Sequence, residues 1–238
     1  MDSHPDFLRF PEIVCEPDPR NAGLSVLEEG VFRDKTIKNQ HAAVAALFLH
    51  EKVPNEIRIQ FETSKNLYLY SWFVYRFYPV TLQHAYTCLE YALRERFEAE
   101  MIEKGERKQE FGPGLKRLLS YAVENEYLRD ENFKVWRRLT ENRARYRTIN
   151  EQFTEMDRLG VREMAFEESK IEIKDVDRGH DYLGVLLETI PWLRNHYAHG
   201  SNSLHNQVLG LLDVVAEVIN QIFPECGSSN QISGDGES

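Results

Sequence analysis

The 238-residue sequence has no apolar run long enough to cross a membrane. Near the N-terminus the longest such run is Ala42 to Leu49, far shorter than the roughly 20 residues that a membrane helix needs. The first residues are acidic and lack the basic-then-apolar pattern of a secretory signal. We therefore expect a cytoplasmic protein with no membrane partner.

Cysteine is also scarce. Cys15, Cys88 and Cys226 are odd in number and widely spaced, a pattern that predicts neither a disulfide framework nor a metal site. The sequence contains no internal repeat and no glycine-rich loop of the kind that cradles phosphates. We expect no metal ion and no cofactor.

Basic residues are outnumbered, and the net charge of −10 argues against nucleic-acid binding driven by the overall field. A local basic patch nevertheless lies at 129–147, where Trp136 and Tyr146 are interleaved with the charges. The same spacing suits an exposed helix face with charge pairs four residues apart, and the aromatics also fit a core stripe, so we favour this alternative. The candidate RNA-binding residues in the patch are Arg137, Arg138, Arg143 and Arg145.

What the sequence does contain is helical periodicity. With 42% apolar and 29% charged residues, the chain has the composition of a soluble globular protein, and nearly every long apolar pattern repeats at 3.6 residues. We predict an all-α fold. The expected helices cover approximately 35–50, 64–78, 81–101, 115–122, 133–156, 182–199 and 204–222.

Other segments break this period. Prolines crowd residues 1–30, which predicts an extended surface arm, and alternating apolar residues at 57–61 predict a short strand or a lead-in. A small hairpin or a mobile insertion is expected within 158–178. The predicted organisation is an N-terminal extension with one helix (1–61), a helical domain (62–224) and a disordered tail (225–238).

The helix near residue 190 ends in polar residues. Its apolar stripe includes Ile190 and Tyr197, while Pro191 predicts a kink and Gly200 a C-terminal cap. Arg194 and His199 lie beyond or beside the stripe, and five residue steps place them roughly 140° apart on an uninterrupted helix. They can share a site only if the helix is distorted, if it ends between them, or if a second chain completes the site.

An arginine suits a phosphate group, and a histidine can accept and return a proton near neutral pH. Together these groups suffice for metal-free RNA cleavage, in which a 2′-hydroxyl attacks its adjacent phosphate. The alternative is that both cations simply favour the dipole at a helix end, and the bare spacing of Arg194 and His199 supports this simpler interpretation.

The stretch Leu193-Arg194-Asn195-x-x-x-His199-Gly200 closely resembles the R-x4-6-H signature of HEPN domains (higher eukaryotes and prokaryotes nucleotide-binding). Upstream, Leu89-Glu90-Tyr91-Ala92-Leu93-Arg94 resembles the family's early core helix with its acidic residue. The resemblance covers roughly 62–223. It implies an up-and-down helical bundle. The offset of roughly 140°, the helix at 64–78 that is apolar nearly all round, and this resemblance together predict a homodimer.

Many HEPN proteins are metal-independent ribonucleases that act as toxins or in phage defence, in some cases with an antitoxin protein. In that scheme Arg194 binds the scissile phosphate of RNA, His199 transfers the proton, and Asn195 holds the phosphate or the local backbone. Glu90 would orient Arg194 or a histidine, although it could simply pair with Arg94 four residues on. Other HEPN domains are catalytically silent and bind a nucleotide or a partner protein, which is our alternative function.

Overall fold

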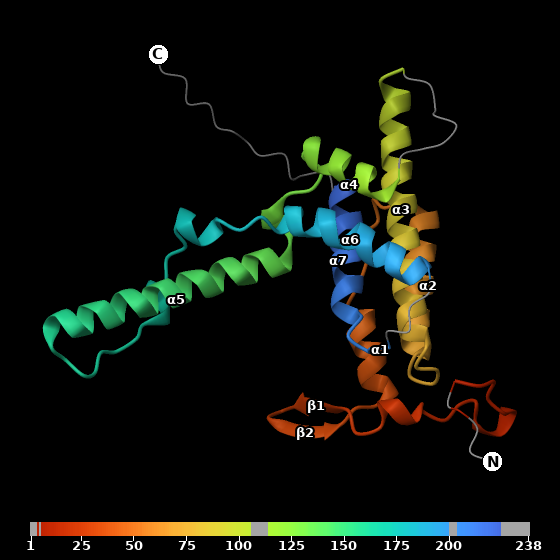
Figure 1. Cartoon of the computed structure of the whole chain (residues 1–238), viewed down its shortest axis with the longest axis horizontal. Helices are drawn as coiled ribbons and strands as arrows, with labels where there is room; N and C mark the ends of the chain where they lie inside the picture. Colours follow the sequence, from red (N-terminus) through yellow and green to blue (C-terminus); the bar gives the residue numbers. More distant parts are fainter. Residues whose placement is uncertain (1–3, 5, 106–113, 200–203, 225–238) are drawn as a thin grey trace.

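A computed structural model of the chain describes residues 4, 6–105, 114–199 and 204–224 (Figure 1). These residues are mostly helical, which confirms the all-α prediction at this level. Their α-helices are α1 (Ile37–Ala45), α2 (Asn55–Tyr70), α3 (Phe77–Glu103), α4 (Leu115–Glu124), α5 (Lys134–Leu159), α6 (Tyr182–Ala198) and α7 (Leu209–Ile222). The predicted cap Gly200 and the predicted tail at 225–238 lie outside the described residues.

Short elements complete the chain. The one sheet among the described residues is an antiparallel hairpin of β1 (Ser25–Glu28) and β2 (Val31–Asp34). The 3-10 helices are η1 (Pro11–Ile13), η2 (Pro19–Asn21), η3 (Asp130–Asn132), η4 (Glu168–Lys170) and η5 (Asp175–Arg178).

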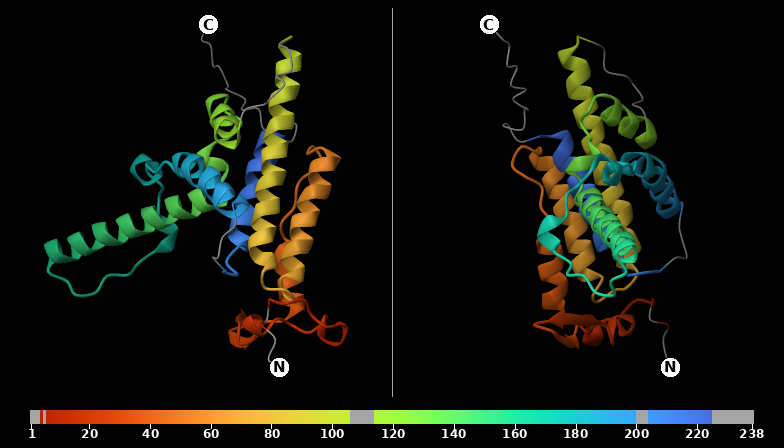
Figure 2. Two further views of the ribbon diagram at one scale, coloured as in Figure 1. Left: turned by 45° about the vertical axis from the view of Figure 1, so that its right-hand side comes forward. Right: turned by 90° about the vertical axis from the view of Figure 1, so that its left-hand side faces the viewer.

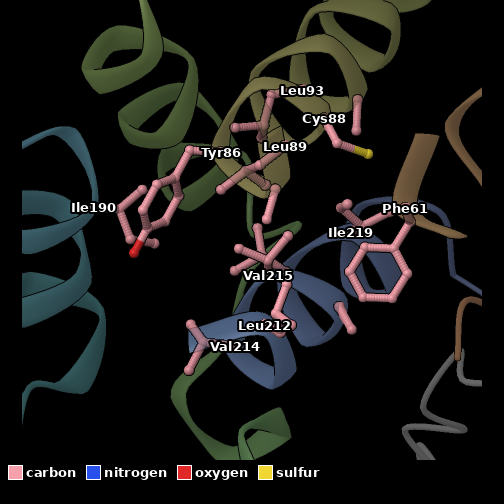
Figure 3. Close-up of a cluster of buried hydrophobic side chains, with 14 of the residues drawn as sticks. Phe61, Tyr86, Cys88, Leu89, Leu93, Ile190, Leu212, Val214, Val215 and Ile219 are labelled. Carbon is pink, nitrogen blue, oxygen red and sulfur yellow. The ribbon is translucent and has the colours of Figure 1, made fainter. Parts of the chain in front are cut away.

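The core is built around α3, which contacts α2, α4, α6 and α7. In Figure 3, Leu89 of α3 lies above Val215 of α7, and Ile219 of α7 lies beside Phe61 of α2; all four side chains are buried. Helices α2, α3 and α7 run side by side, α6 crosses α3 steeply, and α5 projects from the body (Figures 1 and 2). The long central helix thus carries Glu90 to the place where α6 crosses it.

The expectation of a strand or lead-in at 57–61, followed by a helix that begins near residue 64, was wrong. Helix α2 begins at Asn55, directly after Pro54. Ile57 and Phe61 are buried four residues apart on one helix face, whereas Ile59 is 59% exposed. Three apolar residues at alternate positions fit both the strand period of two and the helical period of 3.6 residues. The segment is helical because Ile57 and Phe61 can then both face the core.

The predicted single helix at 64–78 is in fact two. Helix α2 ends at Tyr70 and α3 begins at Phe77, so Pro79 falls in the first turn of α3, where its missing N–H breaks no helical bond. Helix α3 then continues through a run of charged residues to Glu103, two residues beyond the predicted end at about 101. Charge alone does not stop a helix that carries no proline or glycine there.

The N-terminal segment is not simply an extended arm. Residues 25–34 form the β1–β2 hairpin, whose two-residue turn has positive φ at Glu29 (51°) and Gly30 (80°), as hairpin turns of this length require. The buried Asn21 amide donates to the carbonyls of Ser71 (3.1 Å) and Trp72 (2.9 Å) in the α2–α3 connection. The segment is therefore held by specific hydrogen bonds, which the periodicity of apolar residues in the sequence does not predict.

Nor does a hairpin follow α5. Residues 160–181 return along the helix through η4 and η5, where Arg147 pairs with Asp177 (2.9 Å) and donates to the carbonyl of Glu172 (2.6 Å). The expected core stripe on α5 was also wrong, because only Thr140 and Ala144 are buried on this helix. Phe133, just before the helix, is in the core and Trp136 packs against it, but Leu139, Tyr146 and Phe153 farther along are exposed.

One buried polar side chain joins the N-terminal region to the helices. The Gln40 amide on α1 donates to the carbonyl of Tyr68 (2.8 Å) and to the Ser71 hydroxyl (3.0 Å), and it lies 3.2 Å from the Tyr78 hydroxyl. We expect Gln40→Met to lower the free energy of unfolding by about 1–3 kcal/mol, because these buried groups lose their partner. Urea unfolding measures the loss, and Gln207→Met at an exposed position is the control; equal effects of the two substitutions would contradict this role.

A second buried polar group fixes α4 against the end of α3. Burial alone would raise the pKa of Glu100, but hydrogen bonds from Lys104 (2.6 Å), Tyr127 and Tyr121 outweigh it and lower the pKa to about 2. Because this pKa is depressed on folding, Glu100 stabilises the protein above about pH 4.5, and that contribution disappears as the pH falls towards 2. Melting temperatures across this range should fall more steeply in wild type than in Glu100→Gln; parallel curves would argue against this contribution.

Candidate functional site

Helix α6 presents the Arg194 and His199 stretch. The Asp181 side chain caps its first turn by accepting from the amide of Gly184 (2.6 Å), and Leu186, Ile190 and Tyr197 form its buried face. Pro191 lies inside the helix without ending it, and His199 is the C-terminal cap residue. The motif therefore lies on one continuous helix and its terminus.

The C-terminal end of α6 is held by a contact with the segment that precedes α7. The Tyr197 hydroxyl lies 2.9 Å from Nε2 of His205, in the segment before α7. Burial raises the pKa of Tyr197, so its hydroxyl stays neutral and fit for this hydrogen bond. This contact holds the last turn of α6, and with it the backbone of His199, in place.

Glu90 bridges two arginines. Its Oε2 lies 2.9 Å from Nη2 of Arg194, and its Oε1 lies 3.2 Å from Nη2 of Arg94. Arg194 also donates from Nη1 to Oδ1 of Asn195 (3.2 Å). Both interactions considered for Glu90 are therefore present: it pairs with Arg94 along α3, and it also orients Arg194 on α6.

Arg194 lies at a surface hollow of about 390 Å³ between α3, α4 and α6. Cationic groups from two helices converge on it, because Lys116 and Arg117 of α4 line it with Arg194, and Glu90 is the one carboxylate of its lining. The full lining is Glu90, Gly114, Leu115, Lys116, Arg117, Pro191, Arg194 and Asn195. Such a cluster of cations and amides suits an anionic ligand of the size of a phosphate group.

Sequence reasoning missed Lys116 and Arg117. Lys116 forms an exposed ion pair with Glu188 of α6 (3.0 Å). The only signal was a pair of cations at the start of a short amphipathic helix, and such pairs are common on solvated faces. Their convergence with Arg194 arises from the packing of α4 on α6.

His199 does not join this cluster. It is exposed, and because α6 runs unbroken to Ala198, the offset of roughly 140° from Arg194 persists. It shares an outward face with Trp192, seven residues earlier, whose ring is 63% exposed and stacks on His196 at 5.2 Å. One chain therefore presents Arg194 and His199 on different sides of the same helix.

The four arginines considered for RNA contact are exposed on α5 and do not line the Arg194 hollow. Arg145 pairs with Glu168 (2.6 Å), and Arg137 lines a separate hollow beside α1 and α7. Arg138 and Arg143 lie on the same projecting helix. The four arginines are spread around α5 and do not extend the Arg194 hollow.

A hollow of about 480 Å³ beside α2 is larger, but Arg58 and Glu62 in its lining offset each other's charge and leave no cationic cluster. Among the described residues, no group of three or more His, Cys, Asp or Glu side chains is placed to hold a metal ion. None of the helices within the described ranges is both long and apolar enough to span a membrane.

Comparison of the chain with known protein families, with curated proteins and with solved structures finds no match. The chemistry of the Arg194 hollow is therefore inferred from its own side chains.

Proposed function

We propose that this protein is a metal-independent endoribonuclease of HEPN type. The observation that carries the proposal is the ion pair of Arg194 with Glu90 beside the hollow that Lys116 and Arg117 also line. An arginine oriented by a carboxylate, with further cations next to it, suits the phosphate of an RNA backbone. The resemblance of 193–200 to the R-x4-6-H signature gives the same chemistry.

In the proposed reaction, the 2′-hydroxyl of a nucleotide attacks its own 3′-phosphate. The new O2′–P bond forms as the P–O5′ bond breaks, which leaves a 2′,3′-cyclic phosphate and a 5′-hydroxyl. His199 accepts the 2′-hydroxyl proton or donates one to the leaving O5′. Arg194 stabilises the charge that builds on the phosphate oxygens, and Asn195 offers its amide to the same group.

The two residues would meet across a homodimer. Within one chain α6 holds Arg194 and His199 apart, so we propose that Arg194 of one copy acts with His199 of another. The exposed face with Trp192 and His199 is where two α6 helices would approach each other. A cytoplasmic toxin or defence effector, restrained by an antitoxin protein, is the proposed biological setting.

The alternative is a catalytically silent module that binds a nucleotide or a partner protein. It is favoured by one observation, that Arg194 is already paired with Glu90 while His199 faces elsewhere. Wild-type protein incubated with mixed RNAs in EDTA separates the two functions. Cleavage supports the ribonuclease, and intact RNA of every kind with retained nucleotide binding supports the silent module.

The role of α4 is tested by RNA affinity in the His199→Ala background, where the substrate stays intact. We expect Arg117→Ala to weaken binding of single-stranded RNA, and to reduce the slope of log K against log salt by about 0.7, because one phosphate contact is lost. Lys52→Ala, an exposed cation outside the hollow, is the control. If both substitutions change the slope equally, Arg117 does not contact the RNA.

A further inference from the structure

Helix α5 has 26 residues and extends from the body (Figures 1 and 2). Few of its side chains are buried. One of its faces is used within the chain, where Thr140 and Ala144 are buried and Arg147 binds Asp177. Gln152 donates to the carbonyls of Met164 (3.3 Å) and Ala165 (2.9 Å) of the returning segment. The opposite face carries large apolar side chains: Ile149, Phe153 and Met156 line a hollow with Met164 and Phe166 of the returning segment, whereas Leu139 and Tyr146 are exposed.

These apolar residues follow a seven-residue repeat. Leu139, Tyr146 and Phe153 lie seven residues apart and are 41%, 68% and 59% exposed. Exposed Asn142 lies between the first two, half-buried Ile149 lies between the second two, and half-buried Met156 follows, so the steps alternate between three and four. The complete stripe is Val135, Leu139, Asn142, Tyr146, Ile149, Phe153 and Met156. Alternating steps of three and four are the pattern of apolar contact residues in a coiled coil of two helices. The pattern continues here for about 33 Å of helix.

We propose that this stripe is a self-association surface, on which α5 of a second copy packs antiparallel. The proposal does not depend on the proposed ribonuclease activity, since it uses no residue of the Arg194 hollow. A single stripe leaves three large side chains in water, and a second copy is the partner that supplies an apolar face of the same length and spacing.

The distribution of charge along α5 favours antiparallel packing of the two α5 helices. Residues 134–147 carry a net charge of +5, and residues 148–159 carry −2. A parallel pair would place the two basic halves side by side, whereas an antiparallel pair places each basic half against the other copy's acidic half. With the stripe centred between Arg147 and Thr148, Leu139 lies opposite Met156 of the second copy and Tyr146 lies opposite its Ile149.

Sedimentation of the full chain tests the surface. We expect Tyr146→Glu and Phe153→Glu each to halve the mass of the assembly at micromolar concentration, because two buried carboxylates would lie in the seam without partners. Thr154→Glu adds the same charge at an exposed position of α5 outside the stripe and should leave the mass unchanged. Circular dichroism must show equal helix content in all three variants.

Cross-linking tests the direction. In a background with Cys15→Ser and Cys226→Ser, a mixture of L139C and M156C chains should form an intermolecular disulfide under mild oxidation. L139C alone should not, because an antiparallel pair separates its two copies of residue 139 by about 25 Å. A monomeric wild type, a mass unaffected by the stripe substitutions, or self-linking of L139C alone would each overturn the proposal. RNA binding lost in Tyr146→Glu with unchanged mass would instead assign the stripe to base stacking.

Discussion

Replacement of His199 by alanine is expected to lower the rate of RNA cleavage by about 10²–10⁴-fold, the contribution of a positioned acid–base group. The side chain is exposed at the end of α6, so the melting temperature should stay close to that of wild type. If His199 only interacts favourably with the helix dipole, the opposite result is expected: His199→Ala lowers the free energy of unfolding by about 0.3–1 kcal/mol and activity is retained. Single-turnover cleavage of a labelled RNA, measured beside thermal unfolding, distinguishes these outcomes.

The same assay defines the chemistry. EDTA should leave wild-type cleavage intact, the product should end in a 2′,3′-cyclic phosphate, and DNA of the same sequence should remain whole because it lacks the attacking hydroxyl. His41→Ala is the matched control, since this exposed histidine lies on α1 and takes no part in the proposed proton transfer. Full activity in His199→Ala, or cleavage that stops on chelation, would end the assignment of His199 as a catalytic residue.

The second large effect concerns two inactive variants. Arg194→Ala and His199→Ala should each be nearly inactive alone, and mixing them in equal amounts should restore about a quarter of the wild-type rate. Random exchange makes half of the dimers mixed, and each mixed dimer has one site with an intact arginine and an intact histidine. No recovery after subunit exchange, or an active strict monomer, would place both residues in one chain and contradict the shared site.

Arg194→Lys refines this experiment. It keeps the positive charge and the contact with Glu90 within reach, but a single ammonium cannot hold a phosphate at two points. We expect most of the activity to be lost while the Glu90 pairing, and hence stability, is largely kept. Activity equal to wild type would show that Arg194 contributes only charge.

The sequence by itself determined the helical class and most of the helices, because their apolar residues repeat with the helical period over three or more turns. It placed α6 and α7 within a few residues of their ends, and it singled out both Arg194 and Glu90, which meet at 2.9 Å. Short patterns were unreliable: Ile57, Ile59 and Phe61 fit two periods, and the turn at Glu29 and Gly30 gave too weak a signal for the hairpin.

Only the tertiary structure decided what covers each apolar face. The stripes of α5 and α7 look alike in sequence, yet α7 is buried against α3 while Tyr146 and Phe153 of α5 face water. It also decided that Lys116 and Arg117 line the hollow with Arg194 and that His199 faces away from it. A residue pattern fixes the side of a helix on which a group lies, but the neighbour on that side depends on how distant segments pack.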